Sequence, residues 1–131
     1  MQTGKTILVV EDEKSLREAV ADVLRLKNFI VLEAENGEEG VETALAKHPD
    51  LILLDLLMPV MDGTTAFAKI RADAWGKNVP VIILTNLSLT DERLNKSVIK
   101  DKPLYYLVKS DNKIHDMVDK IEEVLKTKET A

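Results

Sequence analysis

The sequence predicts an α/β fold with a parallel sheet that is covered by helices on both faces. Short apolar runs alternate with longer segments in which apolar residues have helical spacing, the pattern of repeated strand–helix units. The runs are apolar at successive positions, as in strands buried on both faces. Five runs and five helical segments alternate, so we expect a doubly wound (βα)5 three-layer sandwich.

Five short stretches are predicted as strands. Four are strongly apolar, and the second along the chain is weaker because it ends in a glutamate. They are Thr6–Val10, Ile30–Glu33, Leu51–Leu54, Val79–Leu84 and Leu104–Val108.

The segments between these strands are predicted as helices, since their apolar residues recur every three or four positions. Asn36 is placed to cap the second helix, and Glu39 follows three residues later, as in a capping box. The last helix has the strongest apolar stripe and the fourth has a thin one. The predicted ranges are Glu13–Lys27, Asn36–Lys47, Thr64–Arg71, Ser88–Lys100 and Lys113–Leu125.

Length and composition indicate a single globular domain. The chain has 131 residues, a hydrophobic fraction of 45% and no cysteine, so disulfides and thiolate metal sites are excluded. The net charge of -5 argues against direct nucleic-acid binding. No apolar run is long enough for a membrane span or a signal peptide, so we expect a cytoplasmic protein with no membrane contact. We expect one domain over residues 1–131, with its core at about 5–126 and no output domain.

Polar residues follow the predicted strands at one edge of the sheet. Glu11 and Asp12 follow the first strand, Asp55 the third, Thr85 the fourth and Lys109 the fifth. Because function in a doubly wound sheet lies outside the carboxyl ends of its strands, we expect these side chains to share one rim.

Three carboxylates at one rim repel each other, and a hard divalent cation would offset that repulsion. Mg²⁺ prefers a few carboxylates together with water and phosphate oxygens. A carboxylate nucleophile, Mg²⁺, a lysine and a hydroxyl form a set that suits phosphoryl transfer to an aspartate. Taken alone, Glu11 and Asp12 could be acids at a helix N-terminus, and Lys109 a solvated strand end. Their combination with Asp55 favours a metal-assisted aspartyl phosphate.

Four segments of the chain resemble response-regulator receiver domains of two-component signalling, chemotaxis regulators among them. They are residues 7–13, 54–63, 79–85 and 106–109, and they occur in the family's order and spacing. The resemblance covers residues 5 to about 126. It implies the flavodoxin-like fold, a five-stranded parallel sheet in the order 2-1-3-4-5.

The resemblance also implies the roles of the acids. Asp55 would accept a phosphoryl group from the phosphohistidine of a sensor histidine kinase or a phosphotransfer protein. Asp12 and Asp55 would bind Mg²⁺, with Glu11 acting directly or through water and the Leu57 backbone carbonyl completing the set. The protein would then be a signalling switch that catalyses only its own phosphorylation and dephosphorylation, with no further cofactor.

A second set of residues would report the phosphoryl group, again by resemblance. Thr85 would contact it, Lys109 would pair with one of its oxygens, and the rotamer of Tyr106 would follow Thr85. A downstream protein partner is expected on the 88–125 face, with the domain a monomer or a phosphorylation-dependent dimer.

The chain departs from the family pattern beside these switch residues. Asn86 follows Thr85 where a small residue is usual, and Ser110 follows Lys109 where proline is usual. A cis bond without proline costs about 2.5–4 kcal/mol, so a trans Lys109–Ser110 bond is expected. Lys102–Leu104 stands where a Gly-Ala pair is usual. We expect Asn86 to crowd or gate access to the phosphate and the 100–112 region to have an altered output surface, while the expected active-site residues are all present.

Three other functions compete with a free-standing receiver. A phosphatase with an aspartate nucleophile would need a second aspartate two residues later, where Leu57 stands. A flavodoxin-like cofactor binder would need a phosphate-cradling loop after the first strand, where residues 11–13 are acidic. The chain could also be the receiver part of a larger transcriptional regulator.

Overall fold

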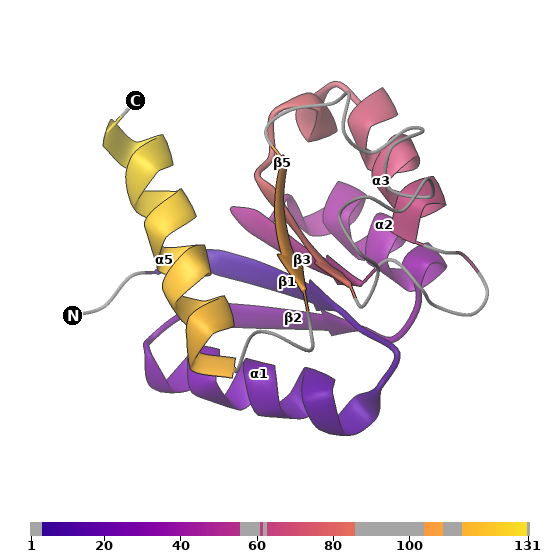
Figure 1. Cartoon of the computed structure of the whole chain (residues 1–131). Helices are drawn as coiled ribbons and strands as arrows, with labels where there is room; N and C mark the ends of the chain where they lie inside the picture. Colours follow the sequence, from indigo (N-terminus) through magenta and orange to yellow (C-terminus); the bar gives the residue numbers. More distant parts are fainter. Residues whose placement is uncertain (1–3, 56–60, 62, 86–103, 109–113, 131) are drawn as a thin grey trace.

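The computed structural model describes residues 4–55, 61, 63–85, 104–108 and 114–130, with the backbone alone described at 64, 85, 104–108 and 127–130. In order, the elements are β1 (Thr6–Val10), α1 (Lys14–Leu26), β2 (Ile30–Ala34), α2 (Gly37–Lys47), β3 (Leu51–Asp55), α3 (Gly63–Ala72), the 3-10 turn η1 (Trp75–Lys77), β4 (Val81–Thr85), β5 (Leu104–Val108) and α5 (Ile114–Thr130). Strands and helices alternate from β1 to β4, and the last described strand is followed by a helix (Figure 1).

The strands form a five-stranded sheet in the order β2-β1-β3-β4-β5, with every neighbouring pair parallel. This confirms the predicted architecture and strand order. Val10 of β1 lies opposite Leu54 of β3, and Asp55 lies opposite Leu84 of β4. The carboxyl ends of β1, β3 and β4 are therefore adjacent.

Helices cover both faces of the sheet, α1 and α5 on one and α2 and α3 on the other (Figure 1). Alternate residues of β1 point into the two cores, Ile7 and Val9 toward α1 and α5, and Leu8 and Val10 toward α2 and α3. Because both faces are covered, β3 is buried along its whole length. The successive apolar residues of the predicted strands thus have a direct structural cause.

The start of α2 agrees with its predicted cap. The side chain of Asn36 accepts a hydrogen bond from the Glu39 amide at 2.8 Å. Glu39 in turn accepts from the Glu35 amide at 3.2 Å, so the first turn is tied to the end of β2. The helix ends where His48 adopts a left-handed conformation with φ 50°.

Several predicted boundaries are corrected. β4 begins at Val81 instead of Val79, because Pro80 has no amide proton to donate to the ladder, although its carbonyl accepts from Ile52 at 3.0 Å. β2 extends to Ala34, and α5 continues to Thr130 beyond the predicted end at Leu125. The first turn of α1 holds no acid, since Glu13 is its N-cap. The predicted helix Ser88–Lys100 lies outside the described residues.

The turn between α3 and β4 is built on a buried arginine. Arg71 is 8% exposed, and it donates to the carbonyls of Gly76 at 2.7 Å and Val79 at 2.8 Å. A side chain at Gly76 would collide with the Ile70 carbonyl, so glycine is required there. Among the described residues, no helix is both long and apolar enough to cross a membrane.

Candidate functional site

The three acids predicted at the rim meet in the structure. Glu11 directly follows β1, and Asp55 is the last residue of β3. Because Val10 and Leu54 are register partners, Glu11 and Asp55 occupy equivalent places on neighbouring strands. One carboxylate oxygen from each of Glu11, Asp12 and Asp55 lies within 4.8 Å of the other two.

Burial strengthens the electrostatic repulsion among these three carboxylates. Glu11 is 2% exposed and Asp55 is 4% exposed, whereas Asp12 faces solvent. Two like charges at this separation repel by about 1 kcal/mol in bulk water and about 4 kcal/mol at an effective dielectric of 20. Oxygen donors at this spacing, with one side open to solvent, fit a hard divalent cation such as Mg²⁺. The donor set therefore agrees with the metal that the sequence predicts.

Glu11 is held through its backbone and its side chain. Its amide donates to the Ala34 carbonyl at 3.0 Å, which extends the pairing of β1 with β2 by one residue. Its Oε2 accepts from the Glu13 amide at 3.0 Å. Its carbonyl accepts from Nη1 of Arg17 at 2.9 Å. The loop after β1 is thus anchored at three points around one residue.

Arg17 is the residue at this site that reasoning from the sequence did not select. It lies on α1 beside the apolar stripe, and its side chain is 12% exposed. Its burial is known only from the structure, and a mostly buried arginine needs an anionic or carbonyl partner, which the Glu11 carbonyl supplies. Helix spacing alone could not decide which partner it has.

The switch residues are described only in part. Thr85 ends β4 beside Asp55, because Asp55 is opposite Leu84, the residue before it. Tyr106 lies opposite Ile83 in β5. The side chains of Thr85 and Tyr106 lie outside the described part of the structure, as do the whole residues Lys109 and Leu57.

Met61 lies against the start of α2. A Cβ at Gly37 would collide with the carbonyl oxygen of Met61, so the Met61 backbone lies directly on the first turn of that helix. Gly37 is buried at this contact. Met61 is therefore packed against the helix start that follows β2.

A second group of possible ligands lies at the start of α5. His115, Asp116 and Asp119 each offer an atom within 4.8 Å of the others, and Nε2 of His115 lies 3.2 Å from Asp116. His115 and Asp119 are exposed, and clusters of this kind are common on helix surfaces without a ligand. This group is therefore assigned no function.

Comparison with known sequences identifies the family. The profile of the response regulator receiver domain matches residues 7–122. The chain is 35% identical over 91 residues to the phosphate regulon transcriptional regulatory protein PhoB of Pseudomonas aeruginosa, covering 70% of this chain and 40% of that protein. It is 33% identical over 126 residues to a protein-glutamate methylesterase/protein-glutamine glutaminase of Archaeoglobus fulgidus, covering 95% of this chain and 35% of that protein. The chain thus spans well under half of these relatives.

Comparison with solved structures agrees. The receiver domain of a sensor histidine kinase from Pseudomonas aeruginosa PAO1, with a magnesium ion coordinated in its active-site cleft, has a TM-score of 0.78 at 30% identity, covering 95% of this chain and 97% of that one. The response regulator TrrA of Thermotoga maritima, in complex with Mg²⁺ and BeF, has a TM-score of 0.76 at 32% identity, covering 92% and 98%. With the acidic rim, the sheet order and the profile match in agreement, the chain belongs to the response regulator receiver domain family of phosphorylation-dependent signalling switches.

Proposed function

We propose that Asp55 is the phosphoacceptor of this receiver. The observation that carries the proposal is the meeting of Asp55 with Glu11 and Asp12 at the carboxyl ends of two adjacent strands. Asp55 is buried at the last position of a rigid strand, which limits the directions from which a donor can approach. A positioned carboxylate of this kind is suited to in-line attack.

The proposed step transfers one phosphoryl group. A carboxylate oxygen of Asp55 forms a bond to phosphorus while the bond from phosphorus to the donor's imidazole nitrogen breaks. The imidazole leaves with that electron pair and is protonated from solvent, and Asp55 becomes an acyl phosphate. Mg²⁺, when bound, would supply positive charge next to the phosphoryl oxygens.

Each remaining residue has one proposed role. Glu11 and Asp12 hold the metal together with Asp55, and the Leu57 carbonyl completes the set. Lys109 pairs with a phosphoryl oxygen, and the Thr85 hydroxyl donates a hydrogen bond to another. The rotamer of Tyr106 then follows the position of Thr85. The chain has Leu57 where a phosphatase would need its acid, so its own phosphorylation and dephosphorylation are the only reactions proposed.

The proposed partners follow from the same role. A sensor histidine kinase or a phosphotransfer protein supplies the phosphoryl group, and a downstream protein binds the 88–125 face of a monomer or phosphorylation-dependent dimer in the cytoplasm. A second arrangement is favoured by the lengths of the relatives. Since two relatives are named as the transcriptional regulators PhoB and ResD, this receiver could control a DNA-binding part of a longer protein.

Acetyl phosphate with Mg²⁺ tests the nucleophile directly. Intact-mass measurement should find one added phosphoryl group on the wild type and none on Asp55→Asn. Asp50→Asn is a matched control, because Asp50 immediately precedes β3, at the end of the strand away from Asp55. Its side chain accepts a hydrogen bond from the Thr6 amide at 2.8 Å. Phosphorylation of Asp55→Asn to the wild-type extent would exclude Asp55, and sizing of the same samples would report any dimer.

A further inference from the structure

Arg17 of α1 links the acidic rim to strand β2 through the Glu11 carbonyl and the Glu33 carboxylate. We propose that Arg17 is a positioning residue for the metal site, since its guanidinium holds the peptide between Glu11 and Asp12 and thereby sets the direction of two of the three carboxylates. This inference rests on the proposed Mg²⁺ role of those acids. It adds a residue that touches neither the metal nor the phosphoryl group.

The guanidinium of Arg17 has two partners. Nη1 donates to the Glu11 carbonyl at 2.9 Å, and Nε lies 3.4 Å from Oε1 of Glu33. An arginine fork is rigid and planar, so its direction is determined once two of its nitrogens are engaged. With only 12% of its side chain exposed, Arg17 has little room to leave this arrangement.

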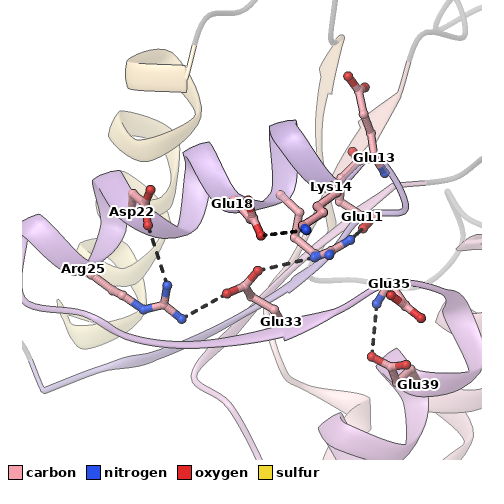
Figure 2. Close-up of polar contacts among 10 residues, drawn as sticks. Glu11, Glu13, Lys14, Glu18, Asp22, Arg25, Glu33, Glu35 and Glu39 are labelled. Carbon is pink, nitrogen blue, oxygen red and sulfur yellow. Dashed lines mark hydrogen bonds and ion pairs between the residues drawn. The ribbon is translucent and has the colours of Figure 1, made fainter.

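The second carboxylate oxygen of Glu33 contacts another arginine of α1, Arg25. Oε2 of Glu33 lies 3.1 Å from Nη2 of Arg25, and both residues appear with their contacts in Figure 2. Glu33 belongs to β2 and pairs with Val9 of β1, so the carboxylate stands on the strand beside the one that leads into the site. The order of contacts is Arg25, Glu33, Arg17 and then the Glu11 carbonyl. Helix α1 and strand β2 together therefore support the loop after β1.

The hydrogen bond from Arg17 restrains the peptide between Glu11 and Asp12. The Glu11 carbonyl belongs to the planar peptide unit that leads into Asp12. The Glu11 amide is already bound to Ala34, so fixing the carbonyl as well restricts rotation between them. Asp12 is exposed, and its carboxylate direction depends strongly on that backbone. Loss of the Arg17 contact would let Asp12 point away from Glu11 and Asp55.

Charge alone predicts the opposite effect. The positive charge of Arg17 beside the acidic rim repels an incoming divalent cation, so its removal should strengthen Mg²⁺ binding if charge repulsion were its whole effect. If Arg17 positions the acids, its removal should weaken binding. The sign of the change therefore separates the two explanations.

Lys14 is a matched control for the charge. It lies on the first turn of α1, its side chain is 76% exposed, and its ion-pair partner is Glu18 at 4.0 Å (Figure 2). Lys14→Met removes one positive charge from the same end of α1 while leaving the Arg17 contacts in place. Arg25→Met removes one support of Glu33 and serves as a control for weakening the α1–β2 contact.

The first test is calorimetric titration of metal-free protein with Mg²⁺. Arg17→Met is expected to bind roughly tenfold more weakly than the wild type, the lower end of the range for residues that orient metal ligands. Lys14→Met should bind equally well or more tightly. Wild-type or tighter affinity in Arg17→Met would overturn the proposal. If that variant does not fold, Arg17→Lys decides in the same way, because an amine cannot replace the fork yet keeps the charge.

A second measurement separates positioning from general damage. In phosphorylation by acetyl phosphate, Arg17→Met should need more Mg²⁺ for half-maximal rate but reach the wild-type rate at saturation. In metal-free protein, the Glu13 amide, which donates to Glu11, should exchange faster with solvent. A lowered saturating rate with an unchanged Mg²⁺ requirement would contradict the inference.

The outcome for the wild type distinguishes this inference from the proposed function. If the wild type binds Mg²⁺ and Asp55→Asn is not phosphorylated, the proposed function stands whatever Arg17→Met does. If the wild type binds no Mg²⁺, both fail, because Arg17 would have no metal site to position.

Discussion

Three carboxylates of unequal burial form the proposed phosphorylation site. Glu11 and Asp55 are almost fully enclosed, and Asp12 alone of the three is open to solvent. In the proposed site the buried pair would supply fixed oxygens, and Asp12 would supply the oxygen that a hydrated cation meets first. This division of roles could not be expected from three acids at strand ends alone.

Asp12→Ala should raise the free energy of unfolding of the metal-free protein by about 1 kcal/mol, because it relieves repulsion with two neighbouring carboxylates at a partly solvated position. It should also abolish the increase in stability that Mg²⁺ causes in the wild type, which is about 2.7 kcal/mol at a hundred times the dissociation constant. Urea unfolding with Mg²⁺ and with a chelator measures both effects.

Asp22→Ala is the control for this prediction, since Asp22 is an exposed acid of α1 that lies 3.9 Å from Arg25 and does not belong to the three-acid cluster. It should leave the Mg²⁺ effect intact. An Asp12→Ala variant that unfolds at lower urea than the wild type without metal would show that repulsion among these acids does not govern stability at this rim.

At the scale of the elements, the first turn of α2 contacts both the end of β2 and Met61. Asn36 caps this turn, and Gly37 lies against the Met61 carbonyl. The helix start is therefore both a local motif and a tertiary contact. The local part was predictable from Asn36 and Glu39, whereas the contact with Met61 required the assembled sheet.

Asn36→Ala should lower the free energy of unfolding by about 1 kcal/mol, since the Glu39 amide loses its acceptor. Asn36→Asp keeps a side-chain oxygen at the same place and should stay close to the wild type. Thermal unfolding of the two variants measures the difference. Equal losses in both would mean that contacts of the Asn36 amide group other than the cap hold this turn.

On the scale of the whole molecule, two apolar cores share one sheet. Ile52 and Leu54 of β3 face the core under α2 and α3, and Leu51 and Leu53 face the core under α1 and α5. A substitution that destabilises one core should therefore also destabilise the other, because both cores include residues of β3. Such a molecule is expected to unfold in a single cooperative step.

Phe67→Ala should lower the free energy of unfolding by about 3–5 kcal/mol, because Phe67 is 1% exposed in the core under α2 and α3. Leu26→Ala is the control, since Leu26 is 83% exposed and should change stability by less than about 0.5 kcal/mol. Trp75 fluorescence and far-UV circular dichroism should give one coincident transition. Separate transitions would show that the two cores unfold independently.

Much of the fold was predictable because the relevant signals are local. Apolar runs, the Asn36 cap and the alternation of strands and helices follow from neighbouring residues. The errors fell at element ends, as at Pro80, whose missing amide proton shortens β4, and at α5, which continues past Leu125. At those ends the final residues depend on hydrogen bonds and packing as well as on spacing.

The sequence by itself determined the fold class and the acids at the rim, because strand periodicity places Glu11, Asp12 and Asp55 at carboxyl ends. The strand order came from resemblance to a family, and the observed order β2-β1-β3-β4-β5 confirms it. Only the tertiary structure decided which acids are buried, how closely their oxygens approach, and that Arg17 holds the Glu11 carbonyl. The physical reason is that burial and side-chain partners across a sheet depend on register and helix packing, which join residues far apart in the chain.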